Sequence, residues 1–151
     1  MTLTDRINEE LKSAMKAGDP AKVSTLRMLK AAVSNAAIQK GKSNLEDGEI
    51  LEVIQKSLKQ HQESVDAFTK GGRPELAEKE AHEAKILKEY LPPAMDEGEL
   101  KALIQATIQE LGASGPSALG AVMKAVLPKV KGRADGKQVS QLVAQLLQAG
   151  R

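Results

Sequence analysis

The stretch EYLPPAMDEGEL, residues 89–100, decides how the chain divides. Pro92 and Pro93 have no backbone N–H to donate, so neither can continue a helix that reaches them from the N-terminal side. Asp96 followed by Glu99 is the spacing of a capping box, which starts a new helix. The sequence therefore predicts two helical units that meet at this point.

Apolar residues recur at three- and four-residue spacing on both sides of this junction. Upstream, Gly18-Asp19-Pro20, Gly41 and Gly71-Gly72 separate four periodic segments. Downstream, the pattern gives three shorter helices with glycine-rich connections. We predict an all-α fold, with a four-helix N-terminal domain over residues 1–93 and a three-helix C-terminal domain over residues 95–151.

Details of the N-terminal helices follow from the same signals. Met15 completes the inward stripe of the first helix, and Phe68 and Tyr90 are expected to fill the bundle. Caps are expected at Thr2 with Asp5, or at Thr4, for the first helix and at Asp19 for the second. For the third helix the sequence offers two capping boxes, Ser43 with Glu46 or Asn44 with Asp47.

Composition limits the core and the compartment. Apolar residues make up 41% of the 151 residues and charged residues 28%, a globular balance. Because Phe68 and Tyr90 are the only aromatic residues, the core is aliphatic, which suits helices. The absence of cysteine excludes disulfides and fits a reducing compartment. With no secretory signal pattern and no apolar run near the roughly 20 residues that span a bilayer, we expect a cytoplasmic monomer without membrane contact.

The two histidines give little sign of a metal centre. Metal-binding bundles of the carboxylate type use Glu-x-x-His pairs on facing helices, whereas Glu78 precedes His82 by four residues. Glu80 and Glu83 lie near His82 in the sequence. We nevertheless interpret His61 and His82 as exposed or half-packed side chains rather than ligands, and we expect no metal.

Catalytic arrangements are also missing from the sequence. His61 and Ser64 share a helix face, but a hydrolase needs an oxyanion hole and an orienting acid, usually with its nucleophile on a strained turn. A serine in the middle of a helix has none of these. The row Glu46, Glu49 and Glu52 is typical of a solvated helix face. We predict no catalytic residue and no cofactor.

One cluster stands above this background, KVKGRADGK at residues 129–137. Over residues 120–137 five cationic side chains face only Asp135, a net charge of +4, whereas residues 93–119 carry a net charge of −3. Peptide N–H groups at the start of the following helix add positive potential, although Asp135 as N-cap occupies part of that site. The cluster indicates a phosphate-binding surface; the sequence leaves a flexible charged loop as the alternative.

Three segments, in the same order, carry a family resemblance. They are KAGDPAKVSTLRMLKAAVSNA at 16–36, HQESVDAFTKGGRPELAEKEAHEAKILKEYLPPAMDEGEL at 61–100 and LGAVMKAVLPKVKGRADGKQVSQLV at 119–143. The chain resembles the YqeY family, free-standing relatives of the C-terminal tail of GatB, a subunit of the tRNA-dependent amidotransferase. Leu119 departs from the methionine expected before the glycine.

The resemblance implies two helical domains and contact with tRNA. In the amidotransferase the GatB tail resembles a tRNA-contacting appendage, and the active sites lie elsewhere. The label "carbon–nitrogen ligase activity, with glutamine as amido-N-donor", often attached to the family, is expected to be inherited from the whole enzyme. We therefore expect this chain not to be an enzyme, since no glutaminase machinery is recognisable in it.

Carried over residue by residue, the resemblance gives candidate RNA-binding residues and candidate backbone positions. The first are Lys124, Lys129, Lys131, Arg133 and Lys137, and the second are Gly120, Gly132, Asp135 and Gly136. With so few aromatic residues for base stacking, recognition of the phosphates of folded RNA is the expected mode. The alternative is a protein-interaction module that docks on an aminoacyl-tRNA synthetase or an amidotransferase.

Overall fold

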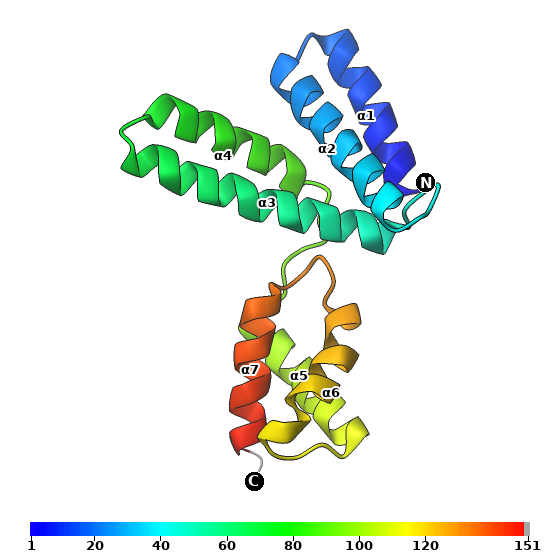
Figure 1. Cartoon of the computed structure of the whole chain (residues 1–151), viewed down its shortest axis with the longest axis vertical. Helices are drawn as coiled ribbons and strands as arrows, with labels where there is room; N and C mark the ends of the chain where they lie inside the picture. Colours follow the sequence, from blue (N-terminus) through cyan, green and yellow to red (C-terminus); the bar gives the residue numbers. More distant parts are fainter. Residues whose placement is uncertain (150–151) are drawn as a thin grey trace. The chain divides into compact units, whose positions relative to one another are not determined.

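The computed structural model describes residues 1–149. Seven α-helices joined by turns form this part of the chain, and none of its residues lies in a strand (Figure 1). The prediction of an all-α fold is confirmed. The chain separates into two compact units, the first Met1–Leu91 and the second beginning at Pro92. The last two residues of the expected C-terminal domain lie outside the described range.

The N-terminal unit consists of two helical hairpins. Its helices are α1 (Leu3–Ala17), α2 (Pro20–Gln39), α3 (Asp47–Lys70) and α4 (Pro74–Lys88). In each hairpin, α1 with α2 and α3 with α4, the two helices lie side by side (Figure 1). Helix α2 also packs against α3 and α4, so that the two hairpins share one core.

Helix starts in this unit follow local chemistry. Thr2 and Asp5 form the expected capping box of α1, each side chain accepting the other residue's backbone N–H. Asp19 caps α2 as predicted, and Pro20 occupies the first helical position, where its missing N–H costs nothing. Both boxes proposed for the third helix are wrong. Helix α3 starts later, with Glu46 and Glu49 in that arrangement.

The core of the N-terminal unit is aliphatic apart from one aromatic residue. It consists of Ile7, Leu11, Leu26, Leu29, Ala37, Leu45, Ile50, Ile54, Ile86, Leu87 and Tyr90. Met15 is 53% exposed rather than inward, because Ala14 takes the buried position of that turn. Phe68 is only half-buried.

Tyr90 joins the end of this unit to its first helix. Its hydroxyl donates a hydrogen bond to Glu10, and the Arg6 guanidinium lies 4.6 Å from the centre of its ring. Arg6 also donates to Glu10 and to the carbonyl of Glu89. Burial, together with the bond to Glu10, raises the pKa of Tyr90, so the hydroxyl remains a donor at neutral pH.

The C-terminal unit packs three helices around a second core. They are α5 (Glu97–Leu111), α6 (Leu119–Val126) and α7 (Gly136–Ala149), with short 3₁₀ turns at Pro116–Ala118 and Leu127–Lys129. The core consists of Leu100, Ile104, Val122, Val126, Val130, Val139, Leu142, Val143 and Leu147. Across the described part of the chain, no helix combines the length and apolarity needed to cross a bilayer.

Candidate functional site

The basic bend, residues 129–137, begins at the end of the 3₁₀ turn after α6 and leads into α7. Its first cation lies near the C-terminal end of α5, where Lys129 Nζ is 3.3 Å from Thr107 Oγ1 and 3.5 Å from Glu110 Oε2. Arg133 lies near the other end of α5, with Nη2 3.3 Å from Glu99 Oε2. Eleven helical positions between those glutamates correspond to about 16 Å. The bend is therefore extended along α5 rather than gathered at one point.

These contacts change the charge balance inferred from the sequence. Glu99 and Glu110 belong to the acidic segment 93–119, and both pair with cations of the basic segment. The charge separation along the sequence is thus partly cancelled in space. Both pairs are solvent-exposed, with the Lys129 side chain 44% and Glu110 68% exposed. Pairs of this kind contribute little stability and exchange easily with other ions.

Arg133 has a structural function that the sequence did not reveal. Its Nε donates to the Pro93 carbonyl at 2.9 Å, and its own carbonyl accepts the N–H of Met95 at 3.0 Å. The residue therefore fastens the bend to the segment that enters α5. Arg133, a candidate RNA-binding residue, thus already has its guanidinium engaged with Pro93 and Glu99.

The other candidate cations differ in availability. Lys124 on α6 and Lys137 in the first turn of α7 are exposed, and neither side chain has an ion pair within residues 1–149. Lys131 is half-buried and already has an interaction. Lys124, Lys129 and Lys137 are therefore the cations that a phosphate could most readily reach.

Only one of the three candidate glycines has a backbone reason to be glycine. Gly132 has φ of 77° and is buried, in the left-handed region that other residues rarely adopt. Gly120 and Gly136 are helical without positive φ, and a Cβ at either position would meet nothing within 4 Å. The structure therefore shows no backbone reason for glycine at these two positions. Asp135 precedes α7, and its Oδ1 accepts the N–H of Lys137 at 3.3 Å.

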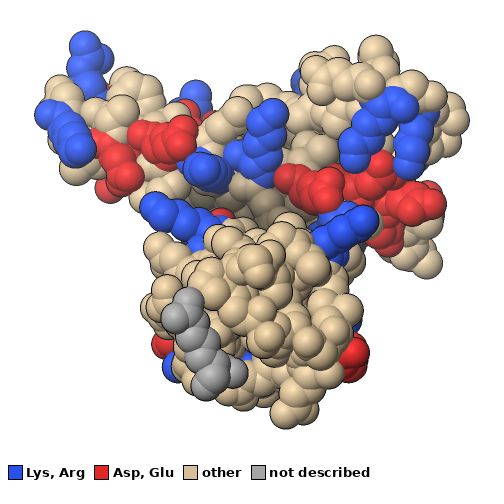
Figure 2. Space-filling model, turned by 60° about the horizontal axis from the view of Figure 1, so that its bottom comes forward, with Lys and Arg blue, Asp and Glu red and all other residues tan. Residues whose placement is uncertain are grey.

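The surface charges are shown in Figure 2. On the N-terminal unit, Lys and Arg alternate with Asp and Glu. On the face of the C-terminal unit seen in Figure 2, few of the described residues are Lys, Arg, Asp or Glu. Consistent with this, α7 has no charged residue after Lys137, and its exposed positions include Gln138, Gln141, Gln145 and Gln148.

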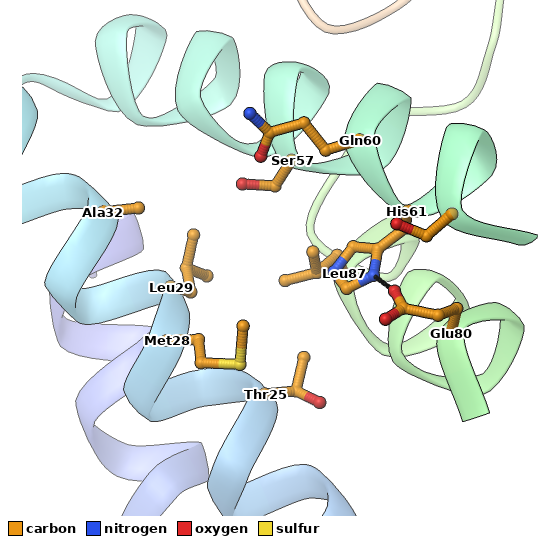
Figure 3. Close-up of a pocket in the computed structure, with 10 residues that line it drawn as sticks. Thr25, Met28, Leu29, Ala32, Ser57, Gln60, His61, Glu80 and Leu87 are labelled. Carbon is orange, nitrogen blue, oxygen red and sulfur yellow. Dashed lines mark hydrogen bonds and ion pairs between the residues drawn. The ribbon is translucent and has the colours of Figure 1, made fainter. Parts of the chain in front are cut away.

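A second feature lies in the N-terminal unit, where a pocket of about 280 Å³ opens between α2, α3 and α4. Figure 3 shows His61 of α3 at its edge, linked to Glu80 of α4. The expectation that both histidines are exposed or half-packed is confirmed, with His82 exposed and His61 half-buried. The sequence noted Glu80 and Glu83 beside His82, but it is His61 that contacts Glu80. The signal that finds the correct partner is the antiparallel hairpin, whose turn at Gly71-Gly72 sets residue 61 opposite the middle of α4.

The fold and the site define a class: a two-unit, all-helical protein with a cationic bend before its last helix. The chain belongs to the YqeY family. The sequence pattern of that family, described as Yqey-like protein, matches residues 4–147, which covers almost the whole of both units.

The chain is also similar to fungal proteins named "Altered inheritance of mitochondria protein 41, mitochondrial". The one from Pyrenophora tritici-repentis is 29% identical over 147 residues, which are 95% of this chain and 80% of that protein. The one from Lachancea thermotolerans is 31% identical over 113 residues, 74% of this chain and 60% of that protein. The one from Eremothecium gossypii is 32% identical over 137 residues, with coverages of 89% and 71%.

These relatives contradict the expected location, and they bear only in part on the expectation that the chain is not an enzyme. The cytoplasmic location expected from the sequence is wrong by this comparison, because the relatives are named as mitochondrial proteins. The absence of cysteine is a weak guide, since it does not distinguish between compartments in which proteins fold without disulfides. Neither the family description nor these names indicate catalysis.

Proposed function

We propose that this protein is a non-catalytic accessory protein that binds tRNA through the C-terminal unit. The observation that carries the proposal is the exposure of three cations in or near the basic bend along the sequence, Lys124, Lys129 and Lys137. Two of them have no ion pair among the described residues, and the pair made by Lys129 is solvent-exposed. A phosphate can replace Glu110 at small cost, because exposed pairs of this kind are weak.

The mode of binding follows from the side chains present. Lysine is a flexible point charge without a fixed hydrogen-bonding plane, so it neutralises phosphates without reading bases. Phe68 and Tyr90 are the only aromatic residues and both belong to the N-terminal unit, so the C-terminal unit has no ring on which a base could stack. Recognition would rest on the spacing of phosphates in folded RNA.

The test is a matched pair of triple variants. Lys124→Ala, Lys129→Ala and Lys137→Ala together should weaken tRNA binding by more than about tenfold at low salt and reduce its salt dependence. The control removes equal charge from the N-terminal unit through Lys12→Ala, Lys16→Ala and Lys30→Ala, all at exposed positions. Equal losses in the two triple variants would indicate general charge attraction and contradict the proposal. Arg133 stays intact because it supports the fold.

The uncharged face of α7 favours a second function, docking on a protein partner. Exposed glutamines on one helix present donors and acceptors without charge, and the cores of protein interfaces are depleted in charged residues. The partner class is an aminoacyl-tRNA synthetase or an amidotransferase. Gln141→Glu with Gln145→Glu should abolish binding to the purified, nuclease-treated partner while leaving tRNA binding nearly unchanged. Binding of the partner that survives both substitutions would exclude this face.

A further inference from the structure

The N-terminal unit holds a group of titratable side chains that RNA binding does not use. His61 of α3 faces Glu80 and Glu83 of α4, with Nδ1 2.5 Å from Glu80 Oε2 and 3.7 Å from Glu83 Oε2. The three ligand atoms all lie within 4.8 Å of one another. Glu80 and Glu83 are three residues apart, so they leave the same face of α4, and α4 packs against α3.

Glu83 makes this group unusual. Its side chain is only 8% exposed, and no described residue donates a hydrogen bond to its carboxylate. The nearest partner, His61 Nδ1 at 3.7 Å, is beyond hydrogen-bond distance. Glu83 is therefore a largely buried carboxylate whose contact is the long ion pair with His61, and its oxygens are not closed off from a further ligand.

The charge balance of the three side chains also favours an additional, positively charged partner. Two carboxylates face a single imidazole, which neutralises at most one of them even when it is protonated. The side chains are substantially removed from water, with His61 12% and Glu80 25% exposed. A divalent cation neutralises both carboxylates and leaves the imidazole neutral, as metal ligation requires.

We propose that His61, Glu80 and Glu83 form a binding site for a divalent transition-metal ion, with Zn²⁺ as the ion that fits best. Imidazole nitrogen combined with carboxylate oxygen suits zinc, whereas Mg²⁺ and Ca²⁺ prefer oxygen ligands alone. Tetrahedral zinc holds its ligand atoms about 3.3 Å apart. The His61–Glu83 distance is already close to this value. Glu80 has to retreat by about 1 Å, and its partly exposed side chain has room to do so.

The pocket gives this site an entry path and a free position. His61 and Glu80 border the pocket, while Glu83 does not line it. Figure 3 shows Thr25 and Met28 of α2 on the wall opposite His61. An ion held by three protein ligands keeps a fourth position, which would face the pocket and accept water or a small anion. The inference does not depend on RNA binding, because every residue in it belongs to the N-terminal unit.

The test is zinc binding by the chelator-treated full chain, measured by titration calorimetry with zinc chloride at neutral pH. The wild type should bind one Zn²⁺ per chain, and Mg²⁺ in large excess should not compete. His61→Ala should weaken zinc binding by more than about tenfold, since even supporting residues of metal sites have effects of that size. His82→Ala is the matched control, because His82 is exposed on α4, and it should leave the affinity unchanged.

Glu83→Gln provides a second readout that a purely structural ion pair would not give. Because Glu83 accepts no hydrogen bond from the described residues and its ion pair with His61 is long, the substitution should change the melting temperature of the metal-free protein little, yet it should abolish the rise produced by zinc. Absorption of the Co²⁺-loaded wild type in the visible range tests the site without any substitution. The proposal is overturned if the wild type binds no zinc, if His82→Ala weakens binding as much as His61→Ala, or if Glu83→Gln retains full zinc affinity.

Discussion

Gly132 combines burial with a φ of 77°. It turns the chain between Val130, in the core of the C-terminal unit, and the start of α7. A residue with a Cβ pays about 1–2 kcal/mol to adopt this conformation. The turn also positions the Arg133 carbonyl, which accepts the N–H of Met95. The geometry of the basic bend therefore depends on Gly132 as well as on the contacts of Arg133.

Gly132→Ala should lower the stability of the C-terminal unit by about 1–2 kcal/mol because of the left-handed backbone. Gly120→Ala is the control. Gly120 is helical with open space around it, so alanine there should be neutral or stabilise by up to about 1 kcal/mol. Urea unfolding followed by circular dichroism measures both variants. Equal stability of the two variants would show that the turn does not constrain the backbone.

At the residue scale, the sequence was least informative about pairings between helices. His61 and Glu83 lie 22 positions apart, and only the register of the α3–α4 hairpin brings them together. Proximity in the sequence drew attention only to His82, but the sequence neighbours of a helical residue point to other faces of the helix. The apolar pattern was also ambiguous in the last turn of α1, because either Met15 or Ala14 could take the buried position. In the structure Ala14 takes it.

At the scale of elements, local signals were sufficient for most helix ends. Prolines and glycines with adjacent caps located the boundaries of α1 and α2. The start of α3 was misplaced because several acceptors occur in a row and glutamate is not a preferred N-cap residue. In the structure the Glu49 carboxylate makes further hydrogen bonds besides the one that belongs to the cap. It accepts hydrogen bonds from the N–H of Glu46 and from Lys40 and Lys42, each at 3.0 Å.

Glu49 should make stability depend on pH. The Glu46 N–H, followed by the two lysines, lowers the pKa of Glu49 from 4.5 to about 2. A carboxyl with a depressed pKa contributes its full stability above the unfolded value, and the contribution is lost as pH falls toward the folded value. Glu49→Gln should therefore be less stable than the wild type at pH 7, and the difference should shrink between pH 4.5 and about 2. Urea midpoints over this range measure it; a difference independent of pH would contradict the account.

The basic bend gives a second prediction at this scale. Arg133→Ala removes the donor to the Pro93 carbonyl and should destabilise the C-terminal unit by about 1–2 kcal/mol. Lys129→Ala breaks only an exposed pair and should change stability by less than about 0.5 kcal/mol. Tyr90, the single tyrosine in a chain without tryptophan, reports the N-terminal unit by fluorescence. Loss of helix without a fluorescence change therefore identifies the C-terminal unit, and similar effects of the two variants would contradict the distinction.

At the scale of the whole molecule, the all-helical class could be predicted and the distribution of charge could not. Apolar periodicity and the prolines at 92 and 93 depend on local chemistry, which the sequence shows directly. The pairing of Lys129 with Glu110 and of Arg133 with Glu99 depends on how the bend lies along α5. A net charge counted over a segment therefore overestimated the free positive charge of the C-terminal unit.

The central claim, that exposed cations of the C-terminal unit bind a polyanion, is tested most directly by the affinity of the wild-type chain for tRNA across a salt series. Three lysines that neutralise three phosphates predict a slope of about −2 to −3 in a plot of log affinity against log salt concentration. A slope near zero, or no binding at about 50 mM salt, would contradict the claim.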